Sequence, residues 1–161
     1  MFRKITATDI PLLVDLAKES WTEHYTAIIG EAQVIYMLNK FNSANAIAAQ
    51  IQDESYHYYF IELNDKPVGY FVVQVKDGEL FLSKFYVAAN QRGNGVGKQT
   101  LQFIITLAKQ FQLKKIALTV NRHNSNSIAA YYKLGFIKTG EVCIDIGNSF
   151  VMDDFMMELS V

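Results

Sequence analysis

The sequence predicts an α/β protein built on one mixed, mostly antiparallel sheet of about seven strands, with helices on both faces. Three observations predict this fold class. Strand-like and helix-like segments follow one another in the order β-α-α-α-β-β-β-α-β-α-β-β. A hairpin signal at Asp77–Gly78 joins two middle strands and indicates antiparallel pairing. A glycine-rich loop then links an apolar strand to an amphipathic helix, which is typical of the crossover between parallel strands.

The first part of the chain predicts a short strand followed by three helices. Phe2–Thr6 has a strand pattern, and Thr8 is placed to cap a helix whose first turn holds Asp9 and Pro11. The apolar face of this helix consists of Ile10, Leu13, Ala17 and Trp21. A second helix is predicted over Glu31–Phe41. Its apolar stripe consists of Val34, Ile35, Leu38 and Phe41. A third helix, capped by Ser43, carries Ile47 and Ile51.

After residue 55 the chain becomes rich in aromatic and β-branched residues, which favour strands. The predicted strands are Tyr56–Leu63, Val68–Val75, Glu79–Val87, Lys115–Val120, Phe136–Ile146 and Phe150–Leu159. Helices are predicted over Thr100–Phe111 and over Ser125–Leu134, the latter ended by Gly135. The last two strands form a closing hairpin that turns at Gly147–Asn148.

Composition limits the kind of protein. The 161 residues have the length of one domain, and we expect residues 1–161 to form a single domain. The net charge of −1 gives no basic excess for nucleic-acid binding. We find no signal peptide, and no apolar run approaches the ~20 residues that span a bilayer. The single Cys143 cannot form an internal disulfide, which fits a reducing compartment. We therefore expect a cytoplasmic protein without nucleic-acid, membrane or metal binding.

The most informative segment is Gln91–Lys98, which has glycines at positions 93, 95 and 97. These glycines let the backbone turn tightly and bring its N–H groups close to a ligand. The helix that begins here adds the positive end of its dipole, so the loop is a predicted anion site, best suited to phosphate. Arg92 and Lys98 add charge at its edges. The spacing matches neither the nucleoside-triphosphate loop nor the dinucleotide motif.

A second motif lies further along the chain, in Val120–Phe136. From Asn124 it reads N-x-x-[AS]-I-x-x-Y-x-K-x-G-F, and it follows the R-x-x-G-x-G of the glycine loop. The two motifs in this order resemble the GNAT superfamily of acyl-CoA-dependent N-acyltransferases. The resemblance is good from Leu80 to about Phe136 and loose elsewhere. The predicted order of strands and helices agrees with that family.

The resemblance implies an enzyme, an acetyl-CoA-dependent N-acetyltransferase that passes the acetyl group directly to a primary amine in a ternary complex. In the family the glycine loop holds the coenzyme A pyrophosphate, and the backbone of the preceding strand pairs with the pantetheine arm. The matching Asn contacts that arm or shapes the cleft. The cofactor-binding residues so implied are Phe85, Tyr86, Val87, Arg92, Gly93, Asn94, Gly95, Val96, Gly97, Lys98, Asn124 and Lys133.

The catalytic residue that the resemblance implies is Tyr131, as the general acid that protonates the departing thiolate. A tyrosine with a pKa of ~10 can donate usefully to a thiolate with a pKa of ~8.5. Tyr132 is the alternative, because helical neighbours point ~100° apart and only one of them can face the cleft. A backbone N–H near Tyr86 or Val87 would stabilise the oxyanion.

The general base is left open by the sequence. Many relatives carry a Glu on the strand before the loop, where this chain has Ser83 and Lys84. Neither is a plausible base in its usual state, since an alkyl ammonium of pKa ~10.4 must lose a proton before attack. The alternatives are Glu79, Asp153, Asp154, His123 and a water chain.

The acceptor amine is also left open. Aromatic and acidic residues in the expected acceptor region suit a cation; they are Trp21, Glu23, His24, Tyr25, Tyr36, Tyr56 and Tyr58. The segment Gly140–Leu159 looks like bacterial polyamine N-acetyltransferases, while peptide N-termini, ribosomal proteins, aminoglycosides and amino acids stay open. The competing hypotheses are a non-catalytic acyl-CoA-binding or sensor module and a nucleotide-binding protein, whose two glycine motifs the spacing of the loop does not match. Relatives are often dimers, and strand edges allow a homodimer here too.

Overall fold

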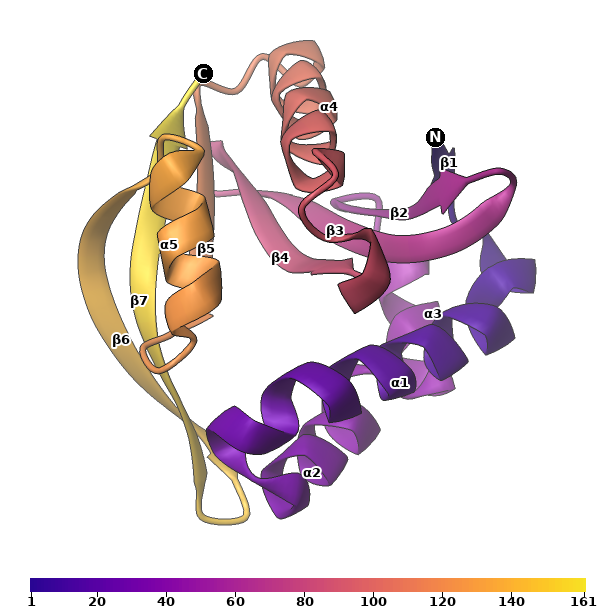
Figure 1. Cartoon of the computed structure of the whole chain (residues 1–161), viewed down its shortest axis with the longest axis vertical. Coiled ribbons are helices and arrows are strands. Elements are labelled where there is room, and N and C mark those ends of the chain that lie inside the picture. Colours follow the sequence, from indigo (N-terminus) through magenta and orange to yellow (C-terminus); the bar gives the residue numbers. More distant parts are fainter. The chain divides into compact units, whose positions relative to one another are not determined.

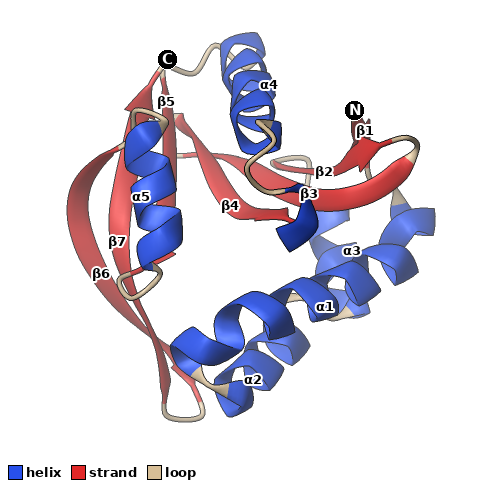
Figure 2. Ribbon diagram, viewed as in Figure 1, coloured by secondary structure: helices blue, strands red, loops and turns tan.

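The computed structural model describes all 161 residues, in five α-helices, two 3-10 turns and seven strands (Figures 1 and 2). The strands are β1 (Phe2–Lys4), β2 (Tyr56–Leu63), β3 (Lys66–Lys76), β4 (Glu79–Val87), β5 (Lys115–Asn121), β6 (Ile137–Gly147) and β7 (Phe150–Ser160). The helices are α1 (Ile10–Ile29), α2 (Glu31–Phe41), α3 (Ala44–Gln52), α4 (Val96–Gln110) and α5 (Ser125–Lys133). The 3-10 turns are Ala7–Asp9 and Ala89–Gln91.

The predicted fold class is confirmed. The strands form one seven-stranded sheet in the order β1-β2-β3-β4-β5-β7-β6. β4 and β5 pair in parallel, with Leu80 opposite Ile116, whereas β1/β2, β5/β7 and β6/β7 are antiparallel. The one crossover between parallel strands contains the glycine loop and α4. None of the five helices combines the length and the apolar character that a membrane crossing requires.

The chain divides into two compact units. The first consists of Met1–Val73 and Lys84–Val96, and the second of Gln74–Ser83 and Gly97–Val161. The strands β3 and β4 and the start of α4 therefore contribute residues to both units.

The first unit has its core between its strands and the three N-terminal helices, which pack on one another (Figure 1). The buried residues of this core are Ile5, Leu13, Ala17, Ile47, Tyr58, Phe60, Tyr70 and Val72. Trp21, at the edge of the predicted stripe of α1, packs against them while staying partly exposed. Alternate residues of β2 and β3 enter the core because successive side chains of a strand point to opposite faces.

Two details of the predicted helices in this unit are wrong. Thr8 does not cap the helix: it lies within a 3-10 turn capped by Thr6, whose N–H donates to Asp9 Oδ2 at 2.9 Å, and the N-cap of α1 is Asp9. In α2 the buried residues are Val34 and Met37, whereas Ile35 is 51% exposed. The helical period allowed either line of residues to face inward, and the packing of α2 on α1 decided between them. The predicted cap of α3 by Ser43 is confirmed.

The second unit has its core between α4 and the strands, and α5 lies in front of β5 and β7 in Figure 1. The buried residues include Leu80, Leu101, Ile104, Leu107, Ile116, Leu118, Phe136 and Met157. The helix α4 begins at Val96, four positions before the predicted Thr100, because the glycine loop leads directly into it. The predicted turn at Asp77–Gly78 is confirmed, but the last hairpin turns at Asn148–Ser149, with positive φ at both residues, instead of Gly147–Asn148.

Candidate active site

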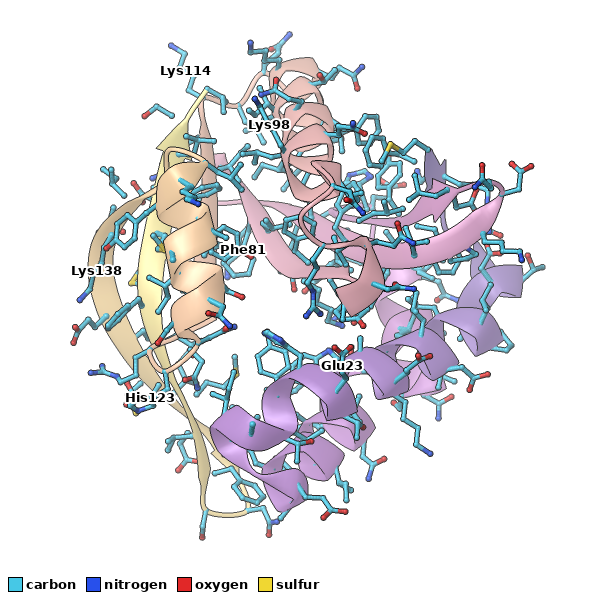
Figure 3. The ribbon with its side chains drawn as sticks, in the orientation of Figure 1. Glu23, Phe81, Lys98, Lys114, His123 and Lys138 are labelled. Carbon is cyan, nitrogen blue, oxygen red and sulfur yellow. The ribbon has the colours of Figure 1, made fainter.

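The glycine loop adopts the open conformation that an anion site needs. Gly93 and Gly95 have φ of 82° and 80°, in the left-handed region that side chains rarely adopt. The loop from 92 to 95 is exposed, and a Cβ placed on either glycine would meet nothing within 4 Å. Val96, which is 5% exposed, anchors the loop where α4 begins. In an α-helix the first N–H groups are not used by the helix itself and can bind a ligand. Lys98 is exposed in the first turn of α4 (Figure 3).

Arg92, at the start of the loop, is engaged by other residues of the first unit. Its Nε donates to the carbonyl oxygen of Val87 at 2.8 Å. Its guanidinium lies 5.5 Å from the centre of the Tyr86 ring and 3.7 Å from a carboxylate oxygen of Glu23. The side chain therefore ties the loop to β4 and α1, and part of its charge is balanced by Glu23.

Tyr86 is the centre of this contact between α1 and β4. Its hydroxyl donates to Glu23 Oε2 at 2.7 Å, and its ring lies 6.2 Å from that of the buried Tyr70. Burial raises the pKa of Tyr86, and the hydrogen bond to Glu23 raises it further. The hydroxyl is thus held protonated as a donor to α1. Figure 3 marks Glu23 on this helix.

A hollow of about 470 Å³ lies along the same side of α1. Its lining residues are Asp15, Lys18, Glu19, Thr22 and Glu23. Of these, only Glu23 is among the predicted acceptor residues, and the acids Asp15 and Glu19 were missed. Their spacing in the sequence could have indicated these two acids, because carboxylates at positions 15, 19 and 23 share one face of a helix. The hollow has an acidic excess, which suits a cation.

The aromatic residues predicted for the acceptor site have two different environments in the first unit. Trp21, His24 and Tyr25 form a cluster on α1, with ring centres 4.6 and 4.7 Å apart. The indole N–H of Trp21 also donates to the hydroxyl of Tyr70 at 3.3 Å. Tyr58 belongs to the core, with 2% exposure and a hydrogen bond to Gln50. Tyr58 therefore serves packing, whereas the cluster on α1 lies nearer to solvent.

The amine of Lys84 is buried, which its position in the sequence did not predict. Its amine donates to the carbonyl oxygen of Phe41 at 3.3 Å and lies 5.7 Å from the centre of the Tyr58 ring. No carboxylate pairs with it, and burial lowers the pKa of Lys84 to about 8. Phe41 is the last residue of α2, so the amine satisfies a carbonyl that the helix leaves unpaired. Its neighbour Ser83 is exposed.

We expect the buried amine of Lys84 to make folding more favourable as the pH rises from about 8 towards 10.5. Over this range the unfolded chain still holds a proton at Lys84, which the folded chain has released. The free energy of unfolding, measured by urea titration at several pH values, should rise in wild type. Lys84→Met should lose Lys84's share of that rise, whereas Lys98→Met, at an exposed lysine, should keep it. Equal slopes in wild type and Lys84→Met would contradict the lowered pKa.

The second motif lies entirely in the second unit. Asn124 is 3% exposed and is the N-cap residue directly before α5, and its carbonyl oxygen accepts from the Ile128 N–H at 3.0 Å. Tyr131 is more buried than Tyr132 and packs edge-on against Phe136, with ring centres 5.4 Å apart. Tyr132 is 50% exposed. Burial therefore distinguishes the two tyrosines. Lys133 is exposed in the last turn of α5, and His123 is exposed in the loop before it (Figure 3).

Comparison with known proteins identifies the family. Residues 13–136 match the acetyltransferase (GNAT) family, and the chain belongs to that family. The match runs through both compact units and includes the glycine loop and the second motif.

Two curated proteins and one solved structure are similar to this chain. It is 32% identical over 78 residues to a probable spermine N(1)-acetyltransferase of Bacillus subtilis subsp. natto, a match covering 48% of this chain and half the length of that protein. It is 23% identical to a spermidine N(1)-acetyltransferase of Thermoplasma acidophilum, over 94% of both chains. The crystal structure of the PaiA N-acetyltransferase of T. acidophilum with coenzyme A has a TM-score of 0.81 and 21% identity, covering 100% of this chain and 98% of that one. This last likeness shows the fold.

Proposed function

We propose that this protein is an acetyl-CoA-dependent N-acetyltransferase acting on a primary amine, with polyamines as the acceptor class. The observation that carries the proposal is the open glycine loop at the start of α4, in a chain of the GNAT family. We also propose that both compact units belong to one catalytic domain over residues 1–161. A cytoplasmic location and a homodimer stay predictions.

The loop is suited to the pyrophosphate of coenzyme A. Backbone N–H groups from Arg92 to Gly97 would bind its oxygens, together with the charge of Lys98. The exposed glycines leave room for a bulky anion, and Arg92 holds the loop against β4 rather than acting as a free cation. The backbone of Phe85–Val87 would pair with the pantetheine arm, as an added strand would. Asn124 and Lys133 complete the proposed set.

The reaction needs a neutral amine, a stabilised oxyanion and a protonated thiolate. We assign thiolate protonation to Tyr131, because it is more buried than Tyr132 and occupies the tyrosine position of the second motif. Tyr86 is a poorer candidate for this step, because its hydroxyl is already committed to Glu23. A backbone N–H near Tyr86 or Val87 would stabilise the oxyanion.

A cationic acceptor is supported by the acidic hollow on α1 and by the aromatic cluster beside it. The names of two relatives specify spermine and spermidine, which are polycations of this kind. Several carboxylates on one helix face would suit an amine with more than one positive charge.

A second candidate function is a non-catalytic acyl-CoA sensor. It is favoured by Ser83 and Lys84, at the positions where many relatives carry a Glu, and by the commitment of the Lys84 amine to α2. Tight acetyl-CoA binding without acetyl transfer to any amine would support the sensor. Acetyl transfer that depends on Tyr131 would exclude it.

The proposal is tested first by thermal unfolding with acetyl-CoA, ATP or NAD. A ligand at 100 times its Kd adds about 2.7 kcal/mol. At about 2–4 °C per kcal/mol, we expect acetyl-CoA alone to raise the Tm by roughly 5–11 °C. Transfer to a panel of amines, polyamines first, is then followed by release of the free thiol. A shift with ATP that acetyl-CoA cannot displace would instead indicate a nucleotide-binding protein.

Gly95→Ala and Gly30→Ala form a matched pair for this experiment. Both glycines have positive φ, and a Cβ on either meets nothing within 4 Å, so the two substitutions impose similar backbone strain. Only Gly95 lies in the loop, whereas Gly30 joins α1 to α2. We expect Gly95→Ala to reduce the shift caused by acetyl-CoA and Gly30→Ala to retain it. Equal shifts in both variants would argue against cofactor binding at the loop.

A further inference from the structure

The group that removes the proton from the acceptor amine can be narrowed by the partners of each candidate. Glu79 pairs with Lys115 at 3.0 Å, and Asp153 pairs with Arg122 at 2.8 Å. In both residues the carboxylate already binds a cation of the protein, so it is engaged before an acceptor ammonium could approach. His123 is exposed in a loop, where nothing orients its ring. One candidate has neither of these features.

That candidate is Asp154 on β7. It is 5% exposed, and no Lys, Arg or His pairs with it. Burial raises the pKa of Asp154, the neighbouring charge of Asp153 adds to this, and a hydrogen bond with the Thr119 side chain acts in the opposite direction. A buried carboxylate without a cation is costly and therefore uncommon unless it has a use.

The position of Asp154 in the second unit agrees with a catalytic role. Across the β5/β7 ladder it lies opposite Asn121, the last residue of β5, and across the β6/β7 ladder it lies opposite Val142. The N–H of Asn124 donates to the Asn121 carbonyl oxygen at 2.9 Å, so the second motif begins at the same end of β5. The carboxyl ends of parallel strands are where α/β sheets bind ligands, and β5 is parallel to β4. No other charged side chain faces Asp154 from β5 or β6 at these positions.

We propose that Asp154 is the general base that accepts a proton from the ammonium group of the acceptor. This inference rests on the proposed function. The carboxylate takes one N–H proton, the freed lone pair forms the C–N bond with the thioester carbonyl carbon, and the C–S bond breaks. A second proton leaves the nitrogen as the intermediate collapses. One proton ends on the thiolate by way of Tyr131, and the other passes from Asp154 to solvent.

The raised pKa serves this step. An ordinary aspartate, with a pKa of ~3.9, is a weak base towards an alkyl ammonium of ~10.4. Raising the pKa narrows the gap, and proton transfer becomes easier as the two values approach each other. Thr119 keeps the carboxylate oriented without supplying a counter-charge.

The test compares Asp154→Asn with Asp153→Asn, which removes the neighbouring carboxylate. With spermidine as acceptor, we expect Asp154→Asn to lower kcat/KM by about 10²–10⁴ at pH 7. Near pH 10.4 about half of an alkyl amine is already neutral, so the loss should shrink as the pH approaches that value. Asp153→Asn keeps the Asp154 carboxylate and removes only a neighbouring charge that raises its pKa, so its loss at pH 7 should be far smaller than that of Asp154→Asn. A loss from Asp154→Asn that is equal at all pH values would mean a structural role and would overturn the proposal.

A second readout needs neither activity nor a variant. Carboxyl ¹³C NMR of the free protein should show Asp154 titrating above the ordinary ~3.9; titration at or below that value overturns the assignment. If wild type transfers acetyl groups and Asp154→Asn matches it, only the role of Asp154 fails. If wild type binds coenzyme A but acetylates no amine, the proposed function fails and the base assignment fails with it.

Discussion

Replacing Tyr131 with Phe should lower kcat for acetyl transfer by about 10²–10⁴, the usual contribution of a positioned general acid. The ring would keep its edge-on contact with Phe136, so the fold should be retained while the proton donor is lost, and the Tm without ligand checks this. The rate is measured as release of free thiol at saturating acetyl-CoA and amine. The Tm shift caused by acetyl-CoA should match wild type, because the hydroxyl acts on the leaving group rather than on the phosphates.

Tyr132→Phe is the matched control. Tyr132 is the next residue of α5 and is 50% exposed, so removal of its hydroxyl should leave kcat close to wild type. A large loss in Tyr132→Phe with a normal rate in Tyr131→Phe would reverse the assignment. Normal rates in both variants would mean that another group or water protonates the thiolate.

The second large expected effect is a loss of stability, caused by a substitution at Gly69 in β3. A Cβ on Gly69 would stand 2.2 Å from the carbonyl oxygen of Tyr86 and 3.1 Å from the Cα of Val87. These are backbone atoms, so no side chain can rotate away and the strands themselves would have to separate. We expect Gly69→Ala to destabilise the fold by about 3 kcal/mol, at the upper end of the usual range for overpacking. The Tm should fall by roughly 6–12 °C.

Gly140→Ala is the control for this prediction. Gly140 also lies in a strand and lacks a positive φ, but its Cβ would meet only the sulfur of Met156 at 3.5 Å, an ordinary contact. The Tm should stay near wild type or rise slightly, because alanine reduces the entropy of the unfolded chain. If Gly69→Ala were equally well tolerated, β3 and β4 would lie further apart at Tyr86 than the structure places them.

The proximity of Gly69 to Tyr86 also bears on the site. Tyr86 belongs to the segment that we propose as the backbone partner of pantetheine, and its hydroxyl is bonded to Glu23. A displaced β4 would carry this hydroxyl and Arg92 with it. Gly69→Ala should therefore also weaken the acetyl-CoA shift, although position 69 is outside the proposed cofactor set.

Local patterns predicted most of the elements. The bounds of α2, β2 and β4 agree with the predicted Glu31–Phe41, Tyr56–Leu63 and Glu79–Val87. Helical periodicity, strand-forming residues and turn signals act between near neighbours, and a sequence displays them directly. The misplaced start of α4 and the misassigned cap at Thr8 have the same origin, because glycines and threonines suit a helix end at several adjacent positions.

The candidate site was predicted less completely. Both motifs identified residues by type and spacing, and the family match includes them. The acids Asp15 and Glu19 were missed because their role depends on which face of α1 is hollow. The choice of Ile35 over Met37 failed for a similar reason, since periodicity defines a stripe and the neighbouring helix selects it.

The sequence by itself determined the order of the elements, the glycine loop and the membership of the motifs in one family. Only the tertiary structure decided the state of the ionisable groups. The amine of Lys84 meets a carbonyl 43 positions away, and the hydroxyl of Tyr86 meets a carboxylate 63 positions away. A pKa depends on burial and on nearby charges, which distant segments supply only after folding. Asp153 and Asp154 are adjacent and chemically identical in the sequence, yet one is ion-paired and the other is buried without a cation.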